Sequence, residues 1–304
     1  MRRQLLLLSF FWFIAVLFST AIGQMQANFP ERYRVTVKGD MIIVGNTMLS
    51  PIGNGDYDNP NAWNYLGQQY VDIDGDSSTF NSSSARVNDP NPGGACPRKV
   101  KKAYLYWASN DNAVPGTTDR VKFKIDNGNY QDIVGTYVGG VTSYSPGTSV
   151  YVYIAEVTDK LTNVAGNYTV ANLQAPNRYA AGWTLFIVYE DASKPARNIS
   201  LFDGLAIVDG YTSAVINIQG FKTVPSPLPV NAKIGFASLE GDAGGVNDQL
   251  LIRTAKSGTN KIALSSPGRP AYNFFNSTYT NESGINYDRT PKSLNLMGYD
   301  AGIL

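Results

Sequence analysis

The chain has no histidine and one cysteine, Cys96. Without histidine, Ser-His-Asp and Cys-His nucleophilic catalysis is excluded, and so is every zinc site that uses an imidazole ligand. Because one cysteine cannot form an internal disulfide, stability has to come from a hydrophobic core or from bound ions. These absences argue against most hydrolases and leave carboxylate-based glycosidases as the class of enzyme still open.

Long apolar runs are also absent, except at the N-terminus, where residues 5–18 are almost entirely apolar. Arg2 and Arg3 precede this run, and small residues follow it as far as Gly23. A basic start, an apolar middle and a small-residue end predict a secretory signal peptide over residues 1–23, cleaved near Gly23. The run is shorter than the ~20 residues of a membrane span. We therefore expect an exported protein, secreted or at the cell surface, with no transmembrane segment in the mature chain.

Charge of one sign is not in excess, since the chain has 25 basic and 24 acidic residues. Loss of residues 1–23 removes two arginines and no acidic residue. A chain so close to neutrality lacks the basic surface that nucleic acid or an anionic membrane would attract. We expect no nucleic-acid partner, and consider an extracellular surface or a glycan instead.

Short apolar or alternating segments recur along the chain, separated by turns rich in Gly, Asn, Asp and Pro, which is typical of all-β folds. Residues 183–189 are apolar almost throughout, which predicts a central strand covered on both faces. Residues 120–125 alternate and are followed by Asn127-Gly128, a pair that favours a tight hairpin. Other predicted strands are 33–38, 41–46, 69–74, 80–87, 102–108, 130–138, 149–155, 167–171, 198–202, 205–208, 214–218, 232–239, 250–253, 261–264, 272–275 and 293–296.

These segments predict an antiparallel β-sandwich, jelly-roll-like, with at most one short helix. The helical turn is expected at 156–164, with Thr158 as its N-cap. Gly39-Asp40 is expected to join the first two strands as a hairpin, and the Ser-rich segment 80–87 to lie at a sheet edge. Residues 24–304 are expected to form one module, although the Pro-rich connector 225–229 could mark a subdivision.

Two acidic loops are candidate calcium sites, because Ca²⁺ takes six to eight oxygen ligands and crowded carboxylates repel one another without a cation. Their carboxylates are those of Asp72, Asp74, Asp76, Glu240, Asp242 and Asp248. The first loop is not an EF-hand, since Ser77 and Ser83 stand where that motif needs Gly and Glu. The alternative is that both loops are solvated turns capped by their own side chains.

Aromatic residues are plentiful, and most of them are expected in the core or in cross-strand pairs. Tyr57 and Trp63 are different, because they lie in the long Gly/Asn/Pro loop 50–64. An aromatic face beside Asn and Asp side chains suits stacking on a sugar, so these two residues are candidate glycan-binding residues.

Several segments, in a fixed order, resemble the N-terminal module of large exported proteins of gliding and related Bacteroidota. They are Gly39-Asp40, Gly45-Asn46 and residues 71–85, 101–109, 182–191, 197–204 and 295–303. Such proteins typically carry Ig-like repeats and a C-terminal sorting domain for type IX secretion, which this chain does not have. The resemblance implies an adhesin-like or motility-associated surface protein and brings no catalytic residue.

The sequence therefore favours a non-catalytic, exported, adhesin-like module that acts in attachment or as the N-terminal cap of a repeat stalk. Downstream repeats of a longer parent protein would then be its neighbours. Two alternatives stay open. One is a carbohydrate-binding, lectin-like module, and the other is a secreted glycan-active enzyme.

Overall fold

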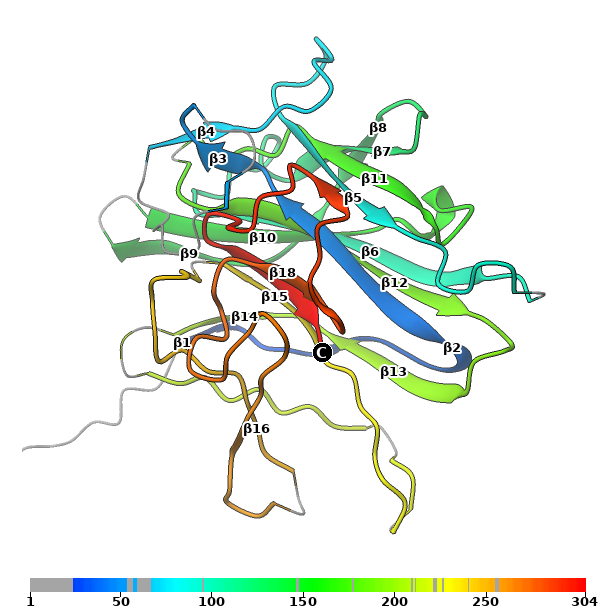
Figure 1. The fold of residues 1–304 in the computed structure, drawn as a ribbon. Helices are drawn as coiled ribbons and strands as arrows, with labels where there is room; N and C mark the ends of the chain where they lie inside the picture. The colour runs from blue at the N-terminus through cyan, green and yellow to red at the C-terminus, as the bar shows by residue number, and fades with distance from the viewer. Residues whose placement is uncertain are drawn as a thin grey trace, which may run out of the picture.

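The computed structural model describes residues 24–53, 57–58, 67–94, 96–145, 148–176, 178–208, 210, 212–220, 223–225, 227–239, 241–254 and 257–304. The predicted signal peptide lies outside them. Regular structure in the described residues is almost entirely β (Figure 1), and their one helix is the short 3-10 helix η1 (Thr158–Lys160). The predicted fold class is confirmed, but Thr158 is the first residue of η1, and Val157 is the N-cap.

Two antiparallel sheets form a sandwich. The first has the strand order β13-β2-β12-β6-β10-β9. Its strands are β2 (Glu31–Thr47), β6 (Lys99–Ser109), β9 (Thr136–Ser145), β10 (Thr148–Glu156), β12 (Ala181–Glu190) and β13 (Ala196–Phe202). The second has the order β20-β5-β11-β7-β8. Its strands are β5 (Ser82–Val87), β7 (Arg120–Ile125), β8 (Gln131–Val134), β11 (Gly166–Ala171) and β20 (Arg289–Thr290). The chain crosses repeatedly between the two sheets, as in jelly rolls.

Smaller sheets surround the sandwich. The C-terminal sheet has the order β15-β21-β18-β19 and is antiparallel except for the β18–β21 pair. Its strands are β15 (Gly235–Leu239), β18 (Tyr279–Asn281), β19 (Gly284–Ile285) and β21 (Tyr299–Ile303). The two-stranded pairs are β1 (Gln24–Ala27) with β14 (Leu205–Ile207), β3 (Leu49–Pro51) with β4 (Gln68–Tyr70), and β16 (Leu251–Ile252) with β17 (Ile262–Ala263).

The main core lies between the two large sheets and contains two fully buried tryptophans, Trp107 and Trp183. Each indole N–H has a partner, because Trp107 Nε1 donates to the Thr118 carbonyl and Trp183 Nε1 donates to Ser83 Oγ, both at 2.9 Å. The large rings are therefore buried without the cost of an unpaired donor.

Strand β12 is buried on both faces, as its apolar sequence predicts. Trp183, Leu185 and Ile187 point into the main core. Phe186 and Val188 point into a second core on the opposite face of the sheet. Because successive side chains of a strand point to opposite faces, an almost unbroken apolar run is what a strand with two covered faces requires.

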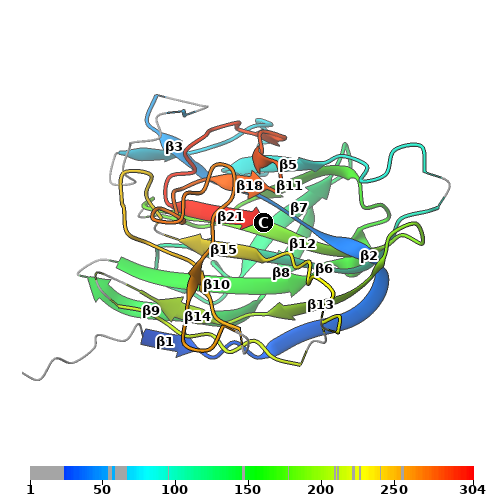
Figure 2. The ribbon, with the colours of Figure 1, turned by 60° about the horizontal axis from the view of Figure 1, so that its bottom comes forward.

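The second core is covered by a strand that folds back over its own sheet. Residues 39–47 of β2 pair with β12, and residues 31–38 pair with β13. Figure 2 shows β2 bending at one side of the molecule and running back beneath the sheet. We call the paired segments 31–38 and 196–202 the folded ribbon. Its Val37 and Ile199 contribute to the second core with Tyr104, Ile154, Phe186 and Val188.

The predicted hairpin at Gly39-Asp40 is wrong, since β2 continues through these residues and bends there. A Cβ atom at position 39 would lie 1.9 Å from the Tyr189 carbonyl oxygen. Glycine is therefore required because two backbones approach closely rather than because the chain turns. Asp40 is buried at the bend and pairs with Arg197 and Lys233, each at 2.9 Å.

The C-terminal sheet covers the other end of β12. Tyr299 lies directly over Gly182, and its hydroxyl is 2.7 Å from Thr184 Oγ1. Inside this sheet, Arg269 and Asp300 form a fully buried ion pair at 2.8 Å. The Asp300 carboxylate also accepts backbone N–H groups of residues 276–278, so the pair is well satisfied.

Other predicted segments differ in ways that tertiary contacts explain. Segment 80–87 is not an edge, because β5 pairs with both β11 and β20. Segment 130–138 divides at Gly135, which packs against Trp107, into β8 and β9 of different sheets. Segments 214–218, 272–275 and 293–296 are not strands. Beyond the connector 225–229, Tyr279, Leu296, Tyr299 and Ala301 are buried in the same contact cluster as the main core.

Candidate functional site

The first acidic loop lies against the β7–β8 hairpin. Asp74 Oδ2 accepts hydrogen bonds from Lys124 Nζ at 2.8 Å and from the Tyr130 hydroxyl at 2.5 Å. Asp72 Oδ1 accepts from Ser82 Oγ at 2.8 Å, and Asp76 Oδ1 caps the N–H of Ser78. The charge of the Asp74 carboxylate is thus balanced by the Lys124 ammonium group.

This environment changes the acidity of Asp74. Burial raises its pKa, but hydrogen bonds from Lys124, Tyr130, the N–H of Asp76 and Ser82 outweigh burial, and the net effect is a pKa well below the usual range. Burial and the neighbouring Asp74 in turn raise the pKa of Tyr130. Asp74 therefore stays ionised and attached to Lys124 at neutral pH.

The second acidic loop packs against residues 273–277. Asp248 Oδ1 accepts the backbone N–H of Phe275 at 2.6 Å, and burial raises the pKa of Asp248. Gly241 lies against Asp300 and the Phe275 backbone, which leaves no room for a side chain. Asp242 is half-buried, and Glu240 lies outside the described residues.

Among the described residues, no group of three or more Asp, Glu or Cys side chains could hold a metal ion together. Each loop is in contact with a different part of the fold. Calcium binding by Asp72, Asp74 and Asp76, or by Glu240, Asp242 and Asp248, stays a prediction.

The predicted aromatic site is described in part. The Tyr57 backbone pairs with the C-terminal segment, donating to Ser293 Oγ at 3.0 Å and accepting from the N–H of Asn295 at 3.1 Å. Trp63 lies outside the described residues. Glycan binding by Tyr57 and Trp63 therefore stays a prediction.

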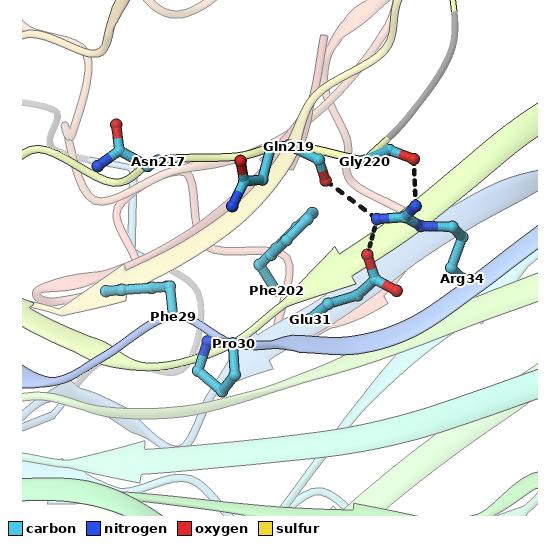
Figure 3. A pocket seen from close by; sticks show the side chains of 8 residues that line it. All are labelled: Phe29, Pro30, Glu31, Arg34, Phe202, Asn217, Gln219 and Gly220. Atoms are coloured by element: carbon cyan, nitrogen blue, oxygen red, sulfur yellow. Dashed lines mark hydrogen bonds and ion pairs between the residues drawn. The ribbon is translucent and has the colours of Figure 1, made fainter.

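An open groove lies on the folded ribbon, at a place that the sequence does not single out. Its volume is about 520 Å³. Figure 3 shows the chain 217–220 on one side and the ribbon with its preceding turn on the other. The lining residues are Phe29, Pro30, Glu31, Arg34, Phe202, Asn217, Gln219 and Gly220.

Three separate segments build this groove. Phe29 and Pro30 stand in the connection between β1 and β2, and Phe202 ends β13. The β13–β2 register shifts between Leu201 and Phe202, so Phe202 is opposite Glu31. Behind it, Asp203 Oδ2 accepts from Arg32 Nε at 2.9 Å and from the Tyr106 hydroxyl at 3.3 Å. These contacts hold the end of β13 in place.

Arg34 holds the third segment over the ribbon. Its guanidinium donates to the Gln219 carbonyl at 3.0 Å, to the Gly220 carbonyl and to the Glu31 carboxylate. Gly220 has a φ of +89°, and a Cβ there would collide with the guanidinium. The positive φ favours glycine at 220, and a side chain there would also displace the Arg34 guanidinium.

Charge and hydrogen bonding distinguish the groove from an ordinary surface hollow. Glu31 and Arg34 neutralise each other, and the other described lining residues are uncharged. The exposed amides of Asn217 and Gln219 have no hydrogen-bond partner among the described residues. The groove thus offers two phenyl rings and two side-chain amides to solvent in a neutral setting.

No protein-family model, curated protein or solved structure matches this chain. The fold defines it as an all-β antiparallel sandwich protein. In the part of the chain that the structure describes, no helix has the length and apolar character needed to cross a membrane.

Proposed function

We propose that this chain is a non-catalytic binding module of an exported, adhesin-like protein at the cell surface. It would act in attachment or at the tip of a repeat stalk. The observation that carries the proposal is the open, neutral groove on the folded ribbon, which presents Phe29 and Phe202 beside the free amides of Asn217 and Gln219. The basic, apolar and small-residue order of residues 1–23 supports export.

The groove lining also favours binding over glycan cleavage. Glycosidases generally need two carboxyl groups facing one bond. Glu31 is the carboxylate among the described lining residues, and Arg34 pairs with it. Among the described lining residues, no second carboxyl group is present to form an acid–base pair with Glu31.

Bead adhesion tests this function directly. The full chain, expressed with its own residues 1–23 and recovered after export, would be coupled to beads and passed over polysaccharide-coated and protein-coated surfaces. We expect retention above that of bare beads and a several-fold loss with Phe202→Ala. Tyr272→Ala is the matched control, since this ring is 61% exposed outside the groove. Retention equal to that of bare beads, or unchanged by Phe202→Ala, would contradict the proposal.

A further inference from the structure

The groove on the folded ribbon has the chemistry of a sugar-binding site. We propose that it binds a neutral carbohydrate, with a hexopyranose unit held between the phenyl rings and the segment 217–220. This inference deepens the proposed function and rests on it.

The two rings supply the apolar side of the site. Phe29 and Phe202 are both half-buried and line the groove together with Pro30. An aromatic face carries partial negative charge, and the axial C–H bonds of a pyranose carry partial positive charge. A sugar ring can therefore lie flat on such a face while its hydroxyl groups project from the rim.

The two amides supply the polar side. Each side-chain amide of Asn217 and Gln219 offers an acceptor oxygen and two N–H donors. A sugar hydroxyl both donates and accepts, so adjacent hydroxyls can engage an amide through both of its ends. Figure 3 shows these amides on the opposite side of the groove from Phe29 and Pro30. A few fixed polar groups facing an apolar wall are typical of small-ligand sites.

The charges select a neutral sugar over an acidic one. The Arg34 guanidinium is occupied by Glu31 and by the carbonyls of Gln219 and Gly220. Glu31 neutralises the charge of Arg34, which weakens its attraction for a uronate or sulfate, and an acidic sugar would in addition meet the Glu31 carboxylate.

An extended peptide fits the groove less well. Peptides that add as strands bind through free backbone groups of an edge. Within the groove, the backbone carbonyls of the lining residues Gln219 and Gly220 already accept from Arg34. The exposed aliphatic residues of the same segment, Ile216 and Ile218, do not line the groove.

The test is titration calorimetry of the full exported chain with defined oligosaccharides. The probes are neutral cello-, xylo- and manno-oligosaccharides, acidic oligogalacturonate and an uncharged extended peptide. The variants are Phe202→Ala, Phe202→Tyr, Asn217→Ala and Gln219→Ala. Asn260→Ala and Tyr272→Ala, which change exposed residues outside the groove, serve as controls. A thermal melt of each variant shows that it is folded.

We expect saturable binding of at least one neutral oligosaccharide. Phe202→Ala should weaken it about tenfold or more, and Phe202→Tyr, which keeps the ring, should retain it. Asn217→Ala and Gln219→Ala should each weaken it about threefold to tenfold. The controls should bind like the parent, and oligogalacturonate should bind at least about tenfold more weakly than the neutral probe.

Three results would overturn the inference. The first is that no neutral oligosaccharide binds at about 10 mM. The second is that neither Phe202→Ala nor Asn217→Ala weakens the binding of a neutral oligosaccharide, and the third is that the chain binds oligogalacturonate or the peptide more tightly than any neutral oligosaccharide. The bead assay distinguishes failure of the sugar-binding inference from failure of the proposed binding function. Adhesion that depends on Phe202 without neutral-sugar binding refutes the sugar and keeps the binding module, whereas loss of both refutes both.

Discussion

At the scale of single residues, the distance between a backbone atom and a neighbouring side chain limits which residues a position can accept. The ring of Tyr299 lies on Gly182, and an added Cβ there would be 2.4 Å from Tyr299 Cγ. The Tyr299 hydroxyl is tied to Thr184, so the ring cannot move aside freely. Gly182 is thus where the C-terminal sheet reaches the central strand.

Gly182→Ala is expected to destabilise the protein by about 1–3 kcal/mol, because overpacking a rigid contact forces the backbone or the ring to shift. Urea unfolding followed by tryptophan fluorescence measures this. Gly166→Ala is the control, since its Cβ would have its nearest neighbour at 3.5 Å, an ordinary contact. Equal unfolding midpoints for Gly182→Ala and Gly166→Ala would show that Tyr299 does not pack as described.

Asp74 is a residue whose charge contributes to stability. Its folded-state pKa is depressed below the ordinary value of 3.8. A depressed carboxylate contributes stability that is present above the unfolded pKa and is lost as the pH falls through the folded pKa.

Asp74→Asn should therefore lower the free energy of unfolding by about 0.5–1 kcal/mol at pH 7, the range of partly exposed ion pairs. The difference from the parent should shrink as the pH is lowered below about 4, where Asp74 begins to protonate in the unfolded chain. Urea unfolding at pH 7, 4 and 2.5 tests this. Asp132→Asn is the control, since its side chain is 79% exposed beside Lys122. A difference independent of pH would rule out an electrostatic role for Asp74.

At the scale of elements, segment 213–220 shows how one side chain can hold a chain that pairs with no strand in the described part of the protein. The alternating sequence predicts a strand at 214–218, but these residues form no strand in the structure. Ile216 and Ile218 are 41% and 54% exposed. The end of this segment is held by the hydrogen bonds that Arg34 donates to the Gln219 and Gly220 carbonyls.

Arg34→Ala is expected to free this segment and increase its cleavage by elastase several-fold, because cleavage follows local opening. Arg34→Lys should give an intermediate rate, since an ammonium cannot reproduce the fork of the guanidinium. Arg86→Ala, which removes an exposed arginine of β5, is the control. Fragments identified by mass spectrometry locate the cuts. Identical cleavage of Arg34→Ala and the parent would contradict the role of Arg34.

The two acidic loops give a prediction about metal removal. The calcium hypothesis requires a higher thermal midpoint in calcium than in EDTA, by several degrees if the ion is well above its dissociation constant. Thermal melts of the parent and of Asp76→Asn measure this, with magnesium as the control ion. Lys124 beside Asp74 would have to give way for an ion to bind in the first loop. Identical midpoints in calcium and EDTA would exclude calcium from both loops.

At the scale of the whole molecule, segments far apart in sequence complete one another. The folded ribbon covers one end of the second face of the six-stranded sheet, and the C-terminal sheet covers the other. Arg289 of β20 is buried and donates to the Pro291 carbonyl at 3.2 Å, while Asn46 of β2 donates to the same carbonyl at 3.1 Å. The residues after the connector 225–229 therefore share their packing with the residues before it.

We expect this shared packing to make residues 24–304 one folding unit. A protease site inserted at 227–229, which is exposed, should allow cleavage without separation of the two pieces on size exclusion. A chain ending at 229 should lack a cooperative thermal transition. Two pieces that separate and melt independently would establish the subdivision at the connector.

The sequence by itself determines most strands and the class of fold, because alternation and apolar runs report how many faces of a strand are covered. The run 183–189 predicts a doubly covered strand, and the structure confirms it. The hairpin predicted after residue 125 is present as β7–β8, but the residue with the left-handed backbone is Asp126 (φ +50°) and not Asn127 or Gly128, so only the place of the turn is predicted correctly.

Only the tertiary structure decides what each element meets. Gly39-Asp40 has the composition of a turn, yet β2 continues through these residues and only bends there. The reason is that residues 39–47 pair with β12 while residues 31–38 pair with β13. The groove depends on register, since it needs Phe29, Phe202 and Gly220 brought together around Arg34. The local pattern of apolar and polar residues predicts whether a side chain is buried, but it does not predict which distant segment buries it. For that reason the sequence predicts the sandwich, and the tertiary structure alone places the groove.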